Sequence, residues 1–315
     1  MAQSHRNQGV TNGNGRAFAA LVVANMALAF GPMFVRLADA GPVAAGFWRM
    51  TLALPLVASM AWMTRAEGER TLRRLPPRLA WLLAAAGVAF AADLASWHVG
   101  IVRTTLANAT LFGNASAFIF PIWGFVVVRA WPSRGQAVAL LLAAAGAALL
   151  MGRSYQLDPA HLAGDLLCVL AGVLYTIYFV LMADVRATMA PLPALAWSSV
   201  AALPPLLVFA LLLGERVMPG DWTPLVGLAL CSQVIGQGCM TYALGRLPPL
   251  AIGLALLVQP VVSAVVGQVL FGEVLGAPDL IGVAMVAAAL VLVRRDAGPA
   301  TAPRPAADAV REEVR

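Results

Sequence analysis

Three features of the chain predict an all-α integral membrane fold, with ten transmembrane helices forming two inverted-topology five-helix repeats around a central cavity. Hydrophobic residues make up 61% of the 315 residues and charged residues only 11%, whereas an average soluble domain has roughly 25% charged residues. A sequence motif recurs in the second half of the chain, and arginine is distributed unevenly between the segments that connect apolar runs. The first feature indicates a membrane protein, and the other two indicate its internal symmetry.

Ten apolar runs are long enough to cross, or nearly cross, a bilayer whose hydrocarbon core is about 30 Å thick. They cover residues 17–37, 43–63, 79–101, 105–128, 135–151, 164–183, 194–213, 223–245, 250–271 and 278–293. Prolines inside these runs, such as Pro32, Pro55 and Pro260, are expected to break or bend the helices. The polar segments 1–16 and 294–315 are predicted to be disordered and cytoplasmic. A linker at 152–163 separates two sets of five runs, so the repeats are expected at 17–151 and 164–293.

The two halves share a motif and matched landmarks. Phe34–Asp39 (FVRLAD) recurs as Phe179–Asp184 (FVLMAD), with four identities in six positions. Trp48–Pro55 and Trp197–Pro204 have the same spacing between tryptophan and proline. Because five is odd, a second copy of five helices enters the membrane from the opposite face, and inverted repeats of this kind are typical of transporters.

Arginine supplies all of the fixed positive charge, since the chain contains no lysine, and it indicates the orientation. With the N-terminus inside, sixteen of the 21 arginines fall in inner segments, and the outer segments hold only Arg36, Arg103, Arg153 and Arg216. This excess predicts that both termini are cytoplasmic, in a multi-pass protein of the cell inner membrane. The net charge of +6 is therefore a topology signal, and nucleic-acid binding is not indicated.

The sequence carries no motif for a cofactor or a metal. Gly236–Gly238 is an isolated fragment inside an apolar run, without the strand that precedes a nucleotide-binding loop. His5 and His161 are too scattered to form a metal site. The three cysteines lie in apolar runs, where they act as small hydrophobes. We expect no cofactor, no metal ion and no direct use of ATP.

Several distinct short motifs are distributed along nearly the whole chain, from about residue 17 to residue 293. They are Gly46–Arg49, Asp93–His98 with Ala107–Thr110, and the closing group Leu256–Pro260, Leu270–Glu273 and Asp279–Gly282. In these motifs the chain resembles the ten-helix drug/metabolite transporters with two EamA-type repeats, and the middle group is similar to a bacterial branch that includes amino-acid exporters. One departure is Trp131–Arg134 in the first repeat, which lacks the acidic residue of Phe271–Glu273 in the second.

The resemblance implies a secondary transporter that exports small metabolites, such as amino acids, by alternating access. It places a cavity among helices one, three, four, six, eight and nine. The partners expected are a small-molecule substrate and the lipid bilayer, and the chain is compatible with a monomer.

Ionisable groups in apolar runs are costly in lipid and are therefore candidates for the lining of a pathway. Trp97 follows Asp93 by one helical turn and shares its face, whereas His98 is offset by about 140°. A functional interpretation places all three on the pathway; the alternative is an Asp93 that ties helices together and a buried, hydrogen-bonded His98. Arg49 is expected to be structural, pairing with carbonyls or a carboxylate to fix helix two.

Neutral polar and aromatic side chains complete the predicted substrate site. Gln233 and Gln237 stand four residues apart, on one face of an α-helix. Such amides can orient a zwitterion without a fixed counter-charge, or they can bond helix to helix, and both interpretations stay open. The further candidate contacts are Asn25, Asn114, Trp123, Tyr175, Tyr178 and Gln259.

Two other classes of function were weighed against transport. An integral membrane enzyme acting on a lipid or isoprenoid would use Asp93 and His98 as its acid and base. A membrane sensor would need a soluble output domain, and the sequence shows none.

Overall fold

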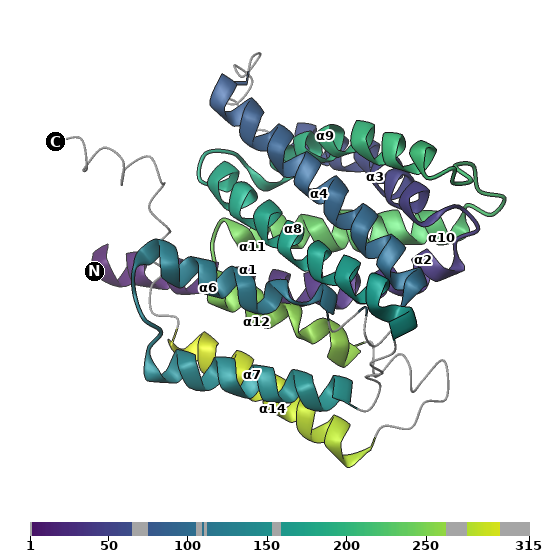
Figure 1. Cartoon of the computed structure of the whole chain (residues 1–315). Helices are drawn as coiled ribbons and strands as arrows, with labels where there is room; N and C mark the ends of the chain where they lie inside the picture. The colour runs from purple at the N-terminus through teal and green to yellow at the C-terminus, as the bar shows by residue number, and fades with distance from the viewer. Residues whose placement is uncertain are drawn as a thin grey trace.

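The computed structural model of the chain is all-helical in the residues that it describes, which are 2–64, 75–104, 109, 112–152, 159–262 and 276–296. The helices pack side by side in one bundle (Figure 1). Large apolar side chains face outwards over much of its surface, among them Val126, Leu141 and Leu212. An exterior of this kind is unfavourable in water and favourable in lipid.

Each of the ten predicted runs is occupied, over its described residues, by one helix or by consecutive helical segments. In chain order they are α1 (Ala2–Leu28), α2 (Gly31–Leu37), α3 (Pro42–Met63), α4 (Pro77–Arg103), α6 (Ser116–Val128), α7 (Arg134–Gly152), the 3₁₀ turn η2 (Pro159–His161), α8 (Leu162–Arg186), α9 (Pro191–Leu212), α10 (Thr223–Leu228), the π-helix η3 (Ala229–Gln237), α11 (Gly238–Leu244), α12 (Pro249–Leu256) and α14 (Ala277–Asp296). Within the described residues, six segments are long and apolar enough to span a membrane, and four more are shorter apolar helices.

Breaks in the helices lie near the middle of their runs. The first run divides into α1 and α2 at Ala29 and Phe30, just before Pro32, whose ring cannot follow a regular helical turn. Helix α12 ends at Leu256, and its C-cap residue Leu257 lies three residues before Pro260. By contrast, Pro55 lies inside the continuous helix α3, so proline alone does not decide where a helix breaks.

The chain ends differ from the sequence-based expectation. Helix α1 begins at Ala2, so the backbone of residues 2–16 is helical where the sequence predicts disorder. Extending a helix that an apolar run has already nucleated costs much less than starting a new one. At the other end, α14 continues to Asp296, and residues 297–315 lie outside the described part of the chain.

The helices pack in pairs that join the two halves of the chain. α3 packs along α9, α6 along α12, and α7 along α14; α4 packs along α8, and α1 along η3 and α11. Numbered by run, these pairs are 2–7, 4–9, 5–10, 3–6 and 1–8. Each of the first three pairs joins a helix to its own counterpart in the other half. The last two pairs, 3–6 and 1–8, are counterparts of each other, because runs 1 and 3 correspond to runs 6 and 8. The packing therefore has an internal two-fold pattern.

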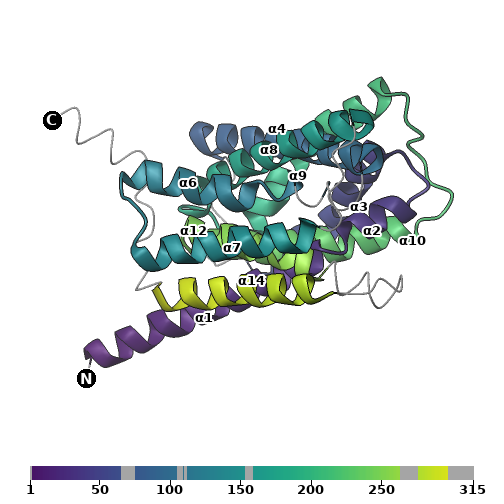
Figure 2. The same cartoon turned by 60° about the horizontal axis from the view of Figure 1, so that its bottom comes forward.

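Packed partners run in opposite directions. Gly124, near the end of α6, lies against Pro249 at the start of α12, whereas Gly253 lies against Ala117 near the start of α6. At Gly253 the two backbones approach so closely that a Cβ atom would overlap the Ala117 carbonyl, as is common where membrane helices pack through small residues. Figure 2 shows α7 and α14 lying side by side in a second such pair.

At one end of the bundle, the loop after α2 contacts the loop after α9. The carboxylate of Glu215 accepts hydrogen bonds from the backbone N–H groups of Val43 (3.2 Å) and Ala44 (2.8 Å). These groups lie in the first turn of α3, where no partner exists within the helix. Glu215 therefore caps a helix that belongs to the other half of the chain.

Further contacts reinforce the same junction. The Trp48 indole donates a hydrogen bond to the Val217 carbonyl (2.7 Å), and the Gly220 N–H donates one to the Asp39 carboxylate (2.8 Å). The Gly41 N–H donates to the Arg216 carbonyl. We call residues 39–48 and 215–220 together the loop clasp.

Candidate functional site

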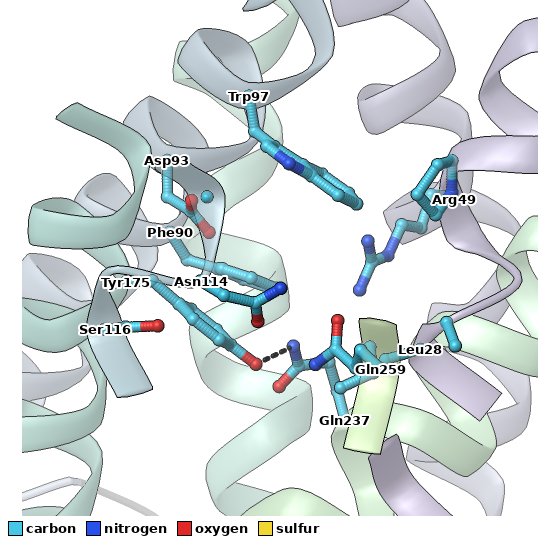
Figure 3. A pocket seen from close by; sticks show the side chains of 13 residues that line it. Leu28, Arg49, Phe90, Asp93, Trp97, Asn114, Ser116, Tyr175, Gln237 and Gln259 are labelled. Atoms are coloured by element: carbon cyan, nitrogen blue, oxygen red, sulfur yellow. Dashed lines mark hydrogen bonds between the residues drawn. The ribbon is translucent and has the colours of Figure 1, made fainter. Parts of the chain in front are cut away.

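A cavity lies in the middle of the bundle, at the point where α1 gives way to α2 (Figure 3). Its lining consists of Leu28, Ala29, Pro32, Arg49, Phe90, Asp93, Trp97, Gly113, Asn114, Ser116, Tyr175, Gln237 and Gln259. The cavity has a volume of about 60 Å³, enough for roughly four water molecules. The cavity is thus enclosed by segments from both halves of the chain.

Six of the predicted substrate contacts reach this cavity, and so does the arginine predicted to be structural. The six are Asp93, Trp97, Asn114, Tyr175, Gln237 and Gln259. Sequence reasoning missed Phe90, which stands three residues before Asp93 and seven before Trp97. That spacing places all three on one face of α4, so the helical period alone could have found it.

The side chains of Asn25 and Gln233 lie behind the lining. Asn25 accepts a hydrogen bond from Gln259 (3.0 Å) and donates one to the Leu21 carbonyl (2.8 Å). Gln233 accepts from Arg49 Nε (3.0 Å) and donates to the Ser199 hydroxyl (3.2 Å). Both amides connect helices and position a residue of the lining.

The predicted shared face of Gln233 and Gln237 is altered by the π-helix η3. Residues four apart lie almost in line in an α-helix, but the wider turn of a π-helix displaces them from one another. Gln237 lines the cavity, whereas Gln233 bonds with Ser199 and Arg49. The Gln237 amide donates to the Tyr175 hydroxyl (2.9 Å), and its buried carbonyl oxygen has no partner among the described residues.

His98, Tyr178 and Trp123 lie outside the lining. His98 is fully buried, with Nδ1 2.7 Å from the Pro42 carbonyl, so this nitrogen donates and fixes α4 against the start of α3. Tyr178 stacks on Phe90, and Trp123 packs against the hydrophobic core. Asp93 faces the cavity and His98 faces α3; no hydrogen bond joins them as an acid–base pair.

Arg49 projects from α3 into the cavity wall and is almost fully buried. Its Nε–H donates to Gln233, and one Nη group donates to the Ser232 carbonyl at 3.4 Å. The guanidinium carbon lies 5.7 Å from the centre of the Phe90 ring, a distance at which an aromatic face attracts a cation. All of these partners are neutral, so they interact with the guanidinium without balancing its positive charge.

Asp93 projects from α4 on another side of the same cavity (Figure 3). It is 7% exposed, and within the described residues its carboxylate has no hydrogen bond and no ion pair within 4 Å. A buried carboxylate without a partner is costly. The cavity wall therefore carries one basic and one acidic side chain, and no ion pair within 4 Å joins them.

Comparison with known proteins follows the same division of the chain. A sequence model described as the EamA-like transporter family matches residues 15–152 and again residues 162–295. A solved structure titled only "Crystal structure of protein" aligns with a TM-score of 0.71 and 16% sequence identity, over 89% of this chain and 97% of that one. At that identity the likeness concerns the fold. Curated protein sequences gave no match.

Proposed function

The chain belongs to the EamA-like transporter family, within the drug/metabolite transporter superfamily, and from that premise we propose that it exports small metabolites such as amino acids without direct use of ATP. The observation that carries the proposal is the cavity in the middle of the bundle. Its polar groups converge from α3, α4, α8 and η3 on a small enclosed volume, as in sites for small solutes.

Two inverted five-helix repeats form the proposed framework. Equivalent helices of the two halves, such as α3 with α9 and α6 with α12, pack against each other and run in opposite directions. Repeats related by an axis along the membrane normal would instead have equivalent helices running the same way. The loop clasp joins the loop after the first run to the loop after the seventh run. Runs two to seven lie between these loops, and an even number of crossings places both loops on the same side of the membrane, in agreement with inversion.

The proposed orientation has both termini in the cytoplasm and the loop clasp on the outer side of the cell inner membrane. It is supported by the arginine excess in the segments then assigned to the inside. A single chain in the bilayer, with a small-molecule substrate as its only other partner, is sufficient for this arrangement.

Alternating access would require the two repeats to rock against one another around the cavity. Three irregular segments, the α1–α2 break, η3 and the turn at Leu257, lie in the middle of their runs. Such segments absorb a change of backbone direction more readily than a continuous helix. The loop clasp joins the repeats at one end, so its contacts have to separate when the cavity opens there.

Flux in proteoliposomes free of ATP tests the proposal. Radiolabelled amino acids loaded inside should exchange with external unlabelled solute, and Trp97→Ala and Gln237→Ala should reduce the rate at least tenfold while the proteins stay monodisperse. Trp81→Ala is a matched control, because Trp81 lies on the same helix and is 77% exposed. Flux equal to wild type in both cavity variants, or no flux of any solute by wild type, counts against the proposal.

A further inference from the structure

An acidic and a basic side chain line one cavity, and within the described residues no ion pair or hydrogen bond joins them. We propose that the cavity binds small zwitterions by both of their charges: Asp93 binds the ammonium group and Arg49 binds the carboxylate. The inference rests on the proposed function for its place in transport, and it adds the substrate class and the residues that determine it.

Arg49 can bind a carboxylate without losing its present contacts. A guanidinium is a planar fork of N–H donors suited to two-point contact with a carboxylate. Among the described residues, Gln233 accepts from Nε–H and the Ser232 carbonyl accepts from one Nη–H, and no other partner binds the guanidinium by a hydrogen bond. The remaining donors belong to a side chain of the cavity wall. The hydrogen bond that Nε–H donates to Gln233, whose amide donates in turn to Ser199, fixes the direction of the fork.

Asp93 supplies the complementary charge. Its carboxylate lines the cavity and has no hydrogen-bond donor among the described residues. An ammonium ion carries three donors and no acceptor, so it satisfies a bare carboxylate without requiring another protein group. Figure 3 shows the Asp93 carboxylate and the Arg49 guanidinium on different sides of the same space.

The geometry gives selectivity against ligands that have only one charge. A cation without a carboxylate would leave Arg49 unpaired, and an anion without an ammonium group would leave Asp93 unpaired. Leaving a buried charge without its partner costs more than the loss of a neutral contact. Recognition would then depend on these two charges, in addition to any contact from the neutral amides of the lining.

The remaining walls and the volume indicate a small ligand. Trp97, Phe90 and Tyr175 present aromatic surface to a short apolar side chain. Space for roughly four water molecules suits an amino acid the size of alanine or serine.

Equilibrium binding to the purified full-length protein in detergent tests the inference with three probes of nearly equal shape. L-alanine has both charges, L-alaninamide (with its amine protonated) has only the ammonium, and L-lactate has only the carboxylate. Wild type should bind alanine at least tenfold more tightly than either analogue, since a charge-assisted contact changes affinity by about tenfold to a hundredfold.

Charge variants assign each end of the ligand. Asp93→Asn should remove the preference for alanine over lactate and keep the preference over alaninamide, and Arg49→Gln should do the reverse. Arg49→Lys should retain selectivity, because it keeps the charge while losing the fork, whereas a purely structural role would make it resemble Arg49→Gln. Asp221→Asn and Arg246→Gln, which change exposed residues outside the cavity, serve as matched controls.

The inference is overturned by equal binding of the three probes to wild type, by the absence of alanine binding, or by charge variants that leave the ratios unchanged. Flux measured with the same preparations separates this result from the wider proposal. Selective alanine binding without flux supports the two-charge site and contradicts transport. Flux of other solutes without selective alanine binding contradicts the two-charge site alone.

Discussion

The loop clasp and the cavity both lie between the two repeats, but they differ in the partners of their polar side chains. In the clasp, Glu215, Trp48 and Asp39 each have a backbone partner from the other repeat. In the cavity, Asp93 has no such partner and Arg49 has only neutral ones. The polar groups of the clasp are satisfied within the protein, whereas the Asp93 carboxylate and the free N–H groups of Arg49 are available to a ligand. Substitutions in the two regions should accordingly change different measurements.

Filling the cavity should have the largest effect. Ala29→Phe places a ring at a lining position, where it occupies the space that a solute needs, and flux in proteoliposomes should fall at least a hundredfold. The clasp contacts are untouched, so the purified variant should remain monodisperse. Ala187→Phe, which adds the same ring at an exposed turn after α8, is the control. If Ala29→Phe transports at the wild-type rate, the solute does not pass through this cavity.

Removing the cap of α3 should have an intermediate effect. It should lower the stability of the protein and leave the selectivity of ligand binding unchanged. Glu215→Ala leaves the N–H groups of Val43 and Ala44 without acceptors, which should lower the free energy of unfolding by about 1–2 kcal/mol. Denaturant titration measures this loss, and Glu215→Gln, which keeps one acceptor oxygen, should lose less. The ratio of alanine to lactate binding should stay as in wild type; a changed ratio would show that the clasp and the cavity are not separable.

The smallest effect should come from the exposed edge of the clasp. Asp39 forms an ion pair with Arg216 at 3.9 Å, with side chains 39% and 64% exposed, and pairs this exposed contribute about 0–1 kcal/mol. Asp39→Asn removes the charge but keeps an acceptor for the Gly220 N–H, so the loss of stability should be below about 0.5 kcal/mol. It should vanish in high salt, where surface charges are screened. A loss as large as that of Glu215→Ala would place Asp39 among the principal contacts.

The positions of the helices could be predicted from the sequence, because an apolar run must be long enough to cross the bilayer and must satisfy its own backbone. Which prolines break a helix could not. Pro32 follows a break and Pro55 does not, since the outcome depends on the neighbouring helices that support the freed groups. The π-helix η3 also leaves no signature in the apolar pattern.

The candidate site was predictable where it lies on one regular helix. Asp93 and Trp97 share one face of α4 and line the cavity, whereas His98, which the functional interpretation placed on the pathway with them, faces α3. The site was not predictable where packing between helices determines whether a side chain lines the cavity. Arg49 has both a structural contact and a place in the cavity wall, and no local pattern distinguishes the two.

Side-specific cysteine labelling tests most directly the claim that two inverted repeats enclose the cavity. Arg78 lies in the first turn of α4, the third helix of the first repeat, and Asp221 lies just before α10, where the third helix of the second repeat begins; both are exposed. In a chain whose three native cysteines are replaced by alanine, Arg78→Cys should react with an impermeant thiol reagent only from the cytoplasmic side and Asp221→Cys only from the outside. Labelling of both positions from the same side would contradict inversion and, with it, the proposed alternation of access.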